Sequence, residues 1–352
     1  MRSVSFENIQ IICVLFMIKK RPTLRDVAKL AGVSKATAAR VVNSDYELVR
    51  EQTRERVLDA VRQLGYERHA IAGSLRSERT YMIALSIPDI TNPFWPEVAR
   101  GVQDTVEQSG YTVVLMNNDW NAEREEKHLR KMRQNQFDGL IINPTGTLNA
   151  DLMQIPVPVV LLASGESYPD FDTVSSDSAQ AGDLAMQHLI ELGHRRIGLI
   201  AGPLRRRKSH THRDTYIKAH REHHLPVDPT LIIQTTFTQE GGYDAMRQLL
   251  DMSQPPTAVF AVNDIIALGA LRAAQMAQLR VPEEMSIIGM DDIFAATTTY
   301  PPLTTIAKPK YAIGVTAARF LLARIEEAES DETQHILLPC TLVQRSSTAA
   351  LQ

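Results

Sequence analysis

The sequence has few cysteines and no membrane-spanning apolar run near its start. Among its 352 residues only Cys13 and Cys340 carry thiols, too few for a disulfide framework, and neither has metal-ligand spacing to a second thiol. The mostly apolar run at residues 9–18 is too short to cross a bilayer and lacks a signal-peptide cleavage pattern. We therefore expect a cytoplasmic protein, translated from Met17, with residues 1–16 a gene-model extension or a disordered tail.

The sequence motifs of common enzyme classes are also missing. The chain has no GxSxG elbow, no Walker loop, no GxGxxG fingerprint and no HExxH zinc motif. His220 and His224 lie four residues apart and could share a metal ion, but such a pair without a third ligand is typical of surface histidines. We expect no enzyme, no metal and no cofactor.

Charge is distributed unevenly along a chain that is otherwise ordinary, with 44% apolar and 22% charged residues. Residues 19–80 contain 14 Lys/Arg and 8 Asp/Glu, whereas residues 81–352 contain 23 and 32. A basic segment at residues 19–80 followed by an acidic one is what DNA-phosphate contacts made by the first segment alone would require. Small helical domains are, however, often a few charges positive.

Residues 23–43, TLRDVAKLAGVSKATAARVVN, have the start and stop signals of two short helices. Thr23 and Ser34 are hydroxyl residues at N-cap positions, and Gly32 can end the first helix. Apolar residues on one side of each helix can pack together. The second helix then presents small, cationic and amide side chains outward, a face that can approach base edges: Lys35, Ala36, Ala39, Arg40 and Asn43. An amphipathic helix pair in an ordinary domain would have the same spacing.

A third helix follows, because apolar residues recur at Val57, Ala60, Val61 and Leu64 before Gly65. Residues 23–43 and their continuation VREQTRERVLDAVRQLGY at residues 49–66 resemble the DNA-binding headpiece of the lactose/galactose repressor (LacI/GalR) family. The resemblance extends from residue 82 to about residue 345. Arg50 stands where that family usually has a serine cap, and Ala39 replaces a serine, so one phosphate contact is expected to be missing.

The resemblance also makes residues 66–80 a hinge that folds into a short helix only when two protomers meet on DNA. A segment this short is marginal as an isolated helix, and Gly73 weakens it by about 1 kcal/mol relative to alanine. Leu75 matches a leucine that the family wedges between base pairs, although a plain linker with Leu75 packed on the body is the alternative. The DNA-binding residues implied are Thr23, Ser34, Lys35, Ala36, Thr37, Ala39, Arg40, Asn43, His69 and Leu75.

From residue 82 short apolar runs alternate with helix-period segments, which predicts doubly wound parallel α/β sheets. Seven runs are expected to be buried strands: MIALSIPD, TVVLMNND, FDGLIINP, PVPVVLLAS, RIGLIAGP, AVFAVND and MSIIGMDD. The resemblance implies two lobes, as in periplasmic sugar-binding proteins, with crossings near Ser164, Ala307 and Ser330. The expected domains are an extension at 1–18, a headpiece at 19–65, a hinge at 66–80, and an effector and dimerisation domain at 81–352, with an N-lobe at 81–163 and 307–329 and a C-lobe at 164–306 and 330–352.

Ligands of such sheets bind beyond the carboxyl ends of the strands. Carried over residue by residue, the resemblance implies effector contacts at Phe94, Trp95, Asn143, Arg213, Phe237, Asn263 and Asp291. Phe94 and Trp95 are candidates to stack on a ring, and Arg213 suits a carboxylate or vicinal oxygens. Asp177 is expected to cap the following helix rather than to touch ligand.

One departure from the family bears on the effector. Tyr216 stands where the family has a glycine, after the cationic loop RRRKSHTHR at residues 205–213, which leaves the register of Arg213 open. The loop would draw in a sugar acid or sugar phosphate, or it is simply solvated. The sequence predicts a DNA-binding regulator, a repressor acting as a homodimer on a pseudo-palindromic operator, controlled by a sugar or sugar acid. The alternative is a solute-binding receptor for transport or chemotaxis, which would require export.

Overall fold

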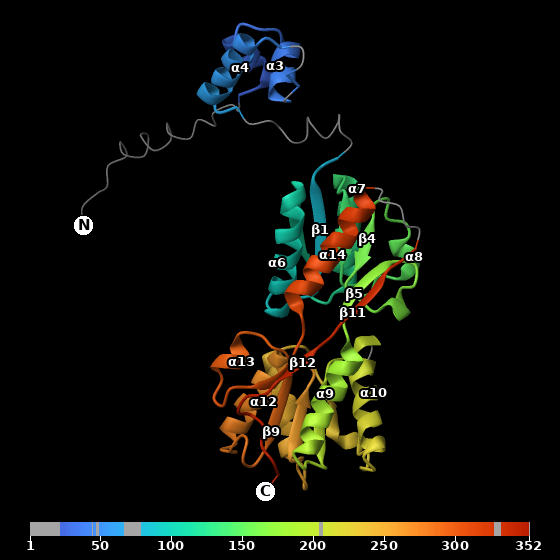
Figure 1. Cartoon of the computed structure of the whole chain (residues 1–352). Coiled ribbons are helices and arrows are strands. Elements are labelled where there is room, and N and C mark those ends of the chain that lie inside the picture. Colours follow the sequence, from blue (N-terminus) through green and yellow to red (C-terminus); the bar gives the residue numbers. More distant parts are fainter. Residues whose placement is uncertain are drawn as a thin grey trace, which may run out of the picture. The chain divides into compact units, whose positions relative to one another are not determined.

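The computed structural model describes residues 22–43, 45–46, 49–66, 79–203, 207–326 and 332–351. The chain divides into two compact units, Met1–Thr80 and Tyr81–Gln352 (Figure 1). The proposed start at Met17, most of the hinge, His69 and Leu75 lie outside the described residues. None of the helices in the described ranges is long and apolar enough to cross a membrane.

The first unit contains α2 (Leu24–Leu30), α3 (Lys35–Val42) and α4 (Glu51–Leu64). Thr23 and Asp26 form a reciprocal capping box at α2, and the Ser34 hydroxyl accepts the Thr37 N–H at 3.0 Å to start α3. Arg50 gives α4 no side-chain cap, as its residue type predicts. The three helices bury a small core of Val27, Ala28, Ala31, Ala38, Val41, Val57 and Ala60.

The N-lobe of the second unit is built on a parallel sheet whose strands follow the order β11 (His335–Leu338), β5 (Asp172–Ser176), β4 (Val159–Leu161), β3 (Gly139–Ile142), β1 (Met82–Ile87) and β2 (Thr112–Asn117). One face is covered by α6 (Phe94–Val106) and α14 (Lys310–Ile325), which lie side by side (Figure 1). The other face packs against α7 (Ala122–Asn135) and α8 (Asn149–Leu152). Short 3-10 turns occur at η2 (Glu107–Ser109) and η3 (Gly165–Ser167).

The α6–α14 contact depends on glycine, because a Cβ atom on Gly101 would lie 2.2 Å from the Tyr311 carbonyl oxygen. A Cβ atom on Gly314 would likewise lie 2.1 Å from the Val98 carbonyl oxygen. The two backbones therefore approach as closely as they do only because both positions lack a side chain.

The C-lobe has a second sheet in the order β12 (Thr341–Val343), β10 (Thr304–Ala307), β9 (Ser286–Asp291), β8 (Ala258–Ala261), β6 (Ile197–Ala201) and β7 (Ile232–Gln234), in which only the β10–β12 pair is antiparallel. Its helices are α9 (Ser178–Glu191), α10 (Arg207–Glu222), α11 (Gln239–Leu250), α12 (Asp264–Met276) and α13 (Ala295–Thr298), with a 3-10 turn at η4 (Pro229–Leu231). The predicted doubly wound α/β class is confirmed, and all seven predicted strands are present.

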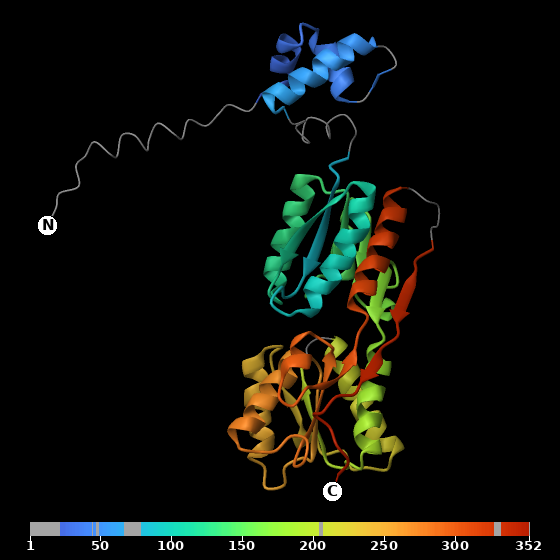
Figure 2. The same cartoon turned by 60° about the vertical axis from the view of Figure 1, so that its left-hand side comes forward.

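Two of the three predicted lobe crossings are placed too early. Strand β5 pairs with β4 and strand β11 pairs with β5, so both belong to the N-lobe sheet. The chain therefore leaves the N-lobe after Ser176 rather than at Ser164, and it leaves finally after Leu338 rather than at Ser330 (Figure 2). The cause is composition: β5 reads DTVSS, which is polar although fully buried, and β11 is largely exposed, so neither has the apolar run of a central strand.

Candidate functional site

The outward face of α3 is basic and free of acidic side chains. Lys35, Ala36 and Arg40 are exposed on α3, which has no Asp or Glu, and the exposed Asn43 is its C-cap. Ala39 between them is half-buried. Because Ala38 and Val41 are buried on the opposite side, the two cations and the amide must point away from the core.

The hydroxyls of Ser34 and Thr23, both predicted to contact DNA, already form hydrogen bonds within the helical unit. The Ser34 oxygen caps α3 and lies 2.9 Å from the Thr37 hydroxyl, which is half-buried. The Thr23 hydroxyl donates to Asp26 at 2.7 Å. These contacts set the start of each helix, and hence the direction in which the α3 face points.

In the second unit an aromatic contact joins the two lobes. Trp120, which follows β2 of the N-lobe, stacks on Phe237 of the C-lobe with ring centroids 5.0 Å apart and planes inclined by 28°. Phe237 lies directly over Gly202, where an added Cβ atom would be 2.2 Å from its ring. Phe237 was a predicted site residue, whereas Trp120 was missed although it follows the carboxyl end of a predicted strand.

Phe94 and Trp95 have different environments at the start of α6. Their rings meet edge to face at 4.9 Å, with planes at 83°. Trp95 is only 7% exposed and belongs to the core beneath α6, whereas Phe94 is half-buried and has the Lys308 ammonium 5.7 Å from its ring centroid. Phe94 therefore offers the more accessible ring of the two, next to a cation.

Asp291 is the centre of a buried group of charges at the end of β9. Its carboxylate lies 2.9 Å from the Lys308 ammonium, and both side chains are largely buried. Burial raises the pKa of Asp291, and the Lys308 cation opposes that rise. The Lys310 ammonium donates to the Asp291 carbonyl at 2.7 Å and lies 3.6 Å from Glu97 of α6. Lys308 is not among the predicted site residues, and its signal in the sequence is its place directly after β10.

Asp264, next to this group, is a second buried acid whose pKa is raised. It is fully buried at the start of α12, and it accepts hydrogen bonds from the Ile293 N–H at 2.9 Å and the Thr305 hydroxyl at 2.6 Å. Burial, and then the charge of Asp291, raise the pKa of Asp264 to about 7. The C-lobe edge therefore contains a carboxyl group that changes charge near neutral pH.

The two predicted asparagines hold local structure. The Asn143 amide donates to the Leu162 carbonyl at 2.6 Å, which ties the end of β3 to the end of β4. The Asn263 amide oxygen accepts the Ile266 N–H at 2.8 Å and so caps α12. Asp177 similarly accepts the Gln180 N–H at 2.9 Å, which confirms its predicted role as the α9 cap.

Arg213 lies in α10, half-buried, and its Nε atom is buried with no hydrogen-bond partner among the described residues. Its Nη2 atom lies 3.6 Å from the carboxylate of the neighbouring Asp214. Tyr216, one turn later, is fully buried and its hydroxyl donates to the Ile197 carbonyl at 2.7 Å; burial raises its pKa. Tyr216 is therefore a core residue of the C-lobe, which sets the face of α10 on which Arg213 lies.

The predicted surface position of His220 is wrong. Its ring is 1% exposed, packs 4.1 Å from Tyr216 and hydrogen-bonds the Tyr216 carbonyl at 2.8 Å, whereas His224 is exposed. The inward-facing side of α10 buries the imidazole because Tyr216 lies one turn before it. Within the described ranges no group of three His, Cys, Asp or Glu residues could hold a metal ion.

Comparison with known proteins gives matches along nearly the whole chain. The profile of bacterial regulatory proteins of the lacI family matches residues 23–69, and that of the periplasmic binding protein-like domain matches residues 186–348. Catabolite control protein A of Priestia megaterium is 37% identical over 93% of this chain and 99% of its own length. Two solved structures are similar as well. The transcriptional regulator CelR in complex with cellobiose is 31% identical, with a TM-score of 0.70 over 93% of this chain and 100% of that chain. The Lac repressor dimer bound to operator and the anti-inducer ONPF is 28% identical, with a TM-score of 0.83 over 94% of this chain and 100% of that chain.

Proposed function

We propose a mechanism of effector-controlled operator binding for this chain, which belongs to the lacI family of bacterial regulatory proteins. Membership makes it a DNA-binding transcriptional regulator of the repressor type and not an enzyme. In this proposal the helical unit binds DNA, and the periplasmic-binding-protein-like unit binds a small molecule. Because a DNA-binding regulator must reach the chromosome, we propose a cytoplasmic, nucleoid-associated location.

The observation that best supports DNA binding is the outward face of α3, which has cationic side chains and no acidic ones. In this proposal Lys35 and Arg40 contact bases or phosphates, Thr37 and Asn43 contact the backbone, and Ala36 and Ala39 allow close approach to base edges. Ser34 and Thr23 are the caps that fix these helices, with hydroxyls near the phosphates. His69 and Leu75, in the proposed hinge at residues 66–80, would reach the minor groove.

The proposed operator is pseudo-palindromic and the proposed form is a homodimer. One α3 face covers only a few base pairs, and a symmetric pair of faces reads two half-sites with a combined affinity that one face cannot reach. The matched Lac repressor structure is a dimer on its operator, which supports the same arrangement here. A hinge that folds only when two protomers meet would make operator binding sensitive to the geometry of the second unit.

The proposed effector is a sugar or sugar acid held between the two lobes. Phe94, Trp95, Phe237 and Trp120 supply aromatic surface, which suits the apolar faces of a sugar ring. Asp291 and Lys308 supply an acceptor and a donor beside Phe94, and Arg213, Asn143 and Asn263 are the further proposed polar contacts. The cellobiose complex of CelR supports a sugar ligand. Lys308 adds a cation suited to a carboxylate on that sugar.

A gel shift with the intergenic DNA beside the gene tests the DNA-reading face. Arg40→Ala should weaken binding by about 1–3 kcal/mol, which is roughly 5- to 150-fold. The control Arg62→Ala removes an exposed cation of α4 that pairs with Asp59 and lies outside the proposed face, and it should bind as the wild type does. Equal loss in both variants, or equal retention, would contradict the assignment of Arg40.

Sugar dependence is tested separately on the same protein by thermal shift with neutral sugars and sugar acids. A ligand at 100 times its dissociation constant adds about 2.7 kcal/mol of stability, which a melting curve resolves. Stabilisation by a sugar or sugar acid, absent in Asp291→Ala, is the expected result. Stabilisation that Asp291→Ala leaves unchanged would move the effector site elsewhere.

A further inference from the structure

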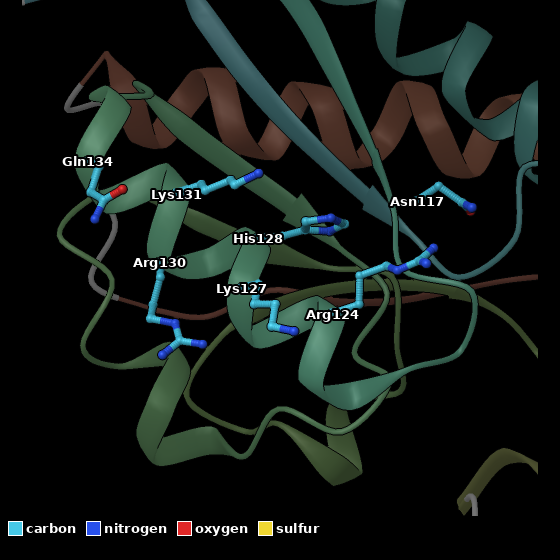
Figure 3. A pocket seen from close by; sticks show the side chains of 7 residues that line it. All are labelled: Asn117, Arg124, Lys127, His128, Arg130, Lys131 and Gln134. Atoms are coloured by element: carbon cyan, nitrogen blue, oxygen red, sulfur yellow. The ribbon is translucent and has the colours of Figure 1, made fainter.

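A cationic concavity lies on the N-lobe, on α7 and outside the proposed effector site. We call it the α7 hollow. Its volume is about 520 Å³, and Figure 3 shows the side chains that line it: Asn117, Arg124, Lys127, His128, Arg130, Lys131 and Gln134. All come from α7 except Asn117, which ends β2. No acidic residue lines the hollow, and nothing in the proposed mechanism uses it.

Two of the four cations of the hollow have acidic partners at the surface. Arg130 lies 3.7 Å from Glu126, an exposed pair that contributes little in water. Arg124 pairs with Asp119 in the loop after β2. Lys127 and Lys131 lie on the same face of the helix, one turn apart, and are exposed. Four cations gathered around one concavity repel one another, and an anion placed among them would relieve that repulsion.

His128 also lines the hollow and carries an unsatisfied polar atom. The residue is half-buried on α7, and its Nδ1 atom is buried with no hydrogen-bond partner among the described residues. Burial lowers the pKa of His128, and the neighbouring Lys131 and Arg124 cations lower it further. An unpaired polar atom of this kind is costly.

We propose that the α7 hollow binds a small phosphorylated metabolite. Its volume is within the range of about 300–1,000 Å³ that small-molecule sites occupy, and is larger than a single inorganic ion needs. Arginine matches phosphate oxygens in a two-pronged geometry and lysine adds point charge, so the combination of Arg124, Lys127 and Lys131 suits a phosphate group.

The hollow is connected to the contact between the lobes through the loop after β2. Arg124 and Asn117 both hold Asp119, Asn117 by a hydrogen bond of 2.5 Å. Asp119 and Trp120 have left-handed backbone conformations, with φ of 51° and 58°. The Trp120 N–H donates to the Pro88 carbonyl at 3.1 Å and to the Asn118 side chain at 2.9 Å, and the contacts to Asp119 add to these bonds. Trp120 in turn stacks on Phe237 of the other lobe. A phosphate that draws Arg124 away from Asp119 would therefore loosen the turn that positions Trp120.

The buried side of α7 fixes the same region from beneath. Glu125, fully buried, accepts from the Asn118 amide at 3.0 Å and from the backbone N–H groups of Thr145, Gly146 and Thr147 at 2.8, 3.0 and 2.9 Å. These bonds join α7 to the loops at the carboxyl ends of β2 and β3. Phosphate binding on α7 thus becomes a second input to the lobe arrangement, separate from the effector.

Isothermal titration of the full-length chain with inorganic pyrophosphate tests the site. The wild type should bind, and Lys127→Ser with Lys131→Ser should weaken binding at least about tenfold, because two charged contacts are lost. The matched control, Arg133→Ser with Arg319→Ser, removes two exposed cations that do not line the hollow and should bind as the wild type does. Sodium sulfate at equal ionic strength corrects for general salt effects.

Three outcomes would overturn the proposal of a site: no pyrophosphate binding by the wild type, equal weakening in both double variants, or equal binding in both. The helical unit is unchanged in all of these proteins, so anion binding to its basic surface contributes equally and cannot produce the expected difference. The proposed DNA and effector functions do not enter the readout, so their failure would be recognised separately.

Tryptophan fluorescence tests the coupling to the lobe contact. The chain has two tryptophans, Trp95 and Trp120, so Trp120→Phe removes one emitter and identifies its signal. Pyrophosphate should change the emission of the wild type and leave that of Trp120→Phe unchanged. Binding without any change in the wild type, or with the same change in both proteins, would overturn the coupling.

Discussion

The carboxyl edges of the two sheets are held in different ways. In the N-lobe the buried Glu125 carboxylate is surrounded by amide and backbone N–H donors, and Asn143 ties neighbouring strand ends together. In the C-lobe the buried carboxylates of Asp264 and Asp291 meet a hydroxyl, a backbone N–H and the Lys308 ammonium. A buried carboxylate whose acceptor sites are all filled by fixed N–H donors holds the surrounding loops in place. The stability of a buried ion pair, by contrast, changes when a charge nearby is added or removed.

This difference assigns separate tasks to the two lobes. At the N-lobe edge the Glu125 hydrogen bonds form a fixed anchor beneath the turn that carries Trp120. At the C-lobe edge the buried acids themselves respond to pH and to a charge placed beside them. The aromatic contact between Trp120 and Phe237 lies between these two edges.

The largest expected effect is a pH dependence that originates at Asp264. Its pKa of about 7 in the folded protein exceeds the ordinary value of 3.8, so between these values the folded state holds a proton that the unfolded chain has released. The stability from this group is full below about pH 4 and is lost as pH rises through 7, a loss of about 4 kcal/mol. Urea unfolding from pH 4 to pH 8 should show a clearly smaller loss in Asp264→Asn. Asp183→Asn, at an exposed carboxylate paired with Lys218, is the control and should keep the wild-type slope.

Breaking the Lys308–Asp291 pair should have the next largest effect. Lys308→Met leaves the buried Asp291 carboxylate without its ammonium and should cost about 3 kcal/mol. Adding Asp291→Asn to the same protein should recover most of that loss, because the uncompensated charge is then gone. Additive destabilisation in the double variant, measured by urea unfolding, would show that the two residues act independently.

On the N-lobe edge, Glu125→Gln should cost about 2 kcal/mol. The amide group of glutamine places N–H donors against the backbone N–H groups of the loop at residues 145–147, so some of those donors lose their acceptor. Glu126→Gln, one residue later and exposed in a surface pair with Arg130, should change the unfolding midpoint very little. A similar loss of unfolding free energy in both variants would contradict the anchoring role of Glu125.

The smallest effect concerns the aromatic contact between the lobes. Phe237→Leu loses the stack on Trp120 and should cost about 1 kcal/mol while shifting tryptophan emission. Phe294→Leu, at a ring that is 77% exposed, serves as the control. An unchanged emission spectrum in Phe237→Leu would mean that the two rings do not hold each other in solution.

The elements that can be predicted from the sequence are those defined by residues close together in the chain. The caps Thr23 and Ser34 and the stop at Gly32 define the helix pair without any tertiary information, and apolar runs define the central strands. Strand β5 was missed because its residues are polar and gain their burial from neighbours distant in the chain. That error displaced the first lobe crossing by about a dozen residues.

The candidate effector site was predicted only where a resemblance pointed to it. Trp120 and Lys308 have no helical or strand periodicity, and their importance comes from Phe237 and Asp291, which only the fold brings near. The burial of Tyr216 and His220 likewise depends on α10 packing against the C-lobe sheet, because the helix sequence is strongly polar overall. Contacts between distant segments are what the sequence alone could not supply.

The most direct test of the whole account is selection of genomic DNA fragments by the purified full-length chain, followed by sequencing. The account predicts enrichment of a pseudo-palindromic site by the wild type and its loss in Arg40→Ala. Failure of the wild type to enrich any sequence, or enrichment of the same site by Arg40→Ala with undiminished affinity, would contradict it.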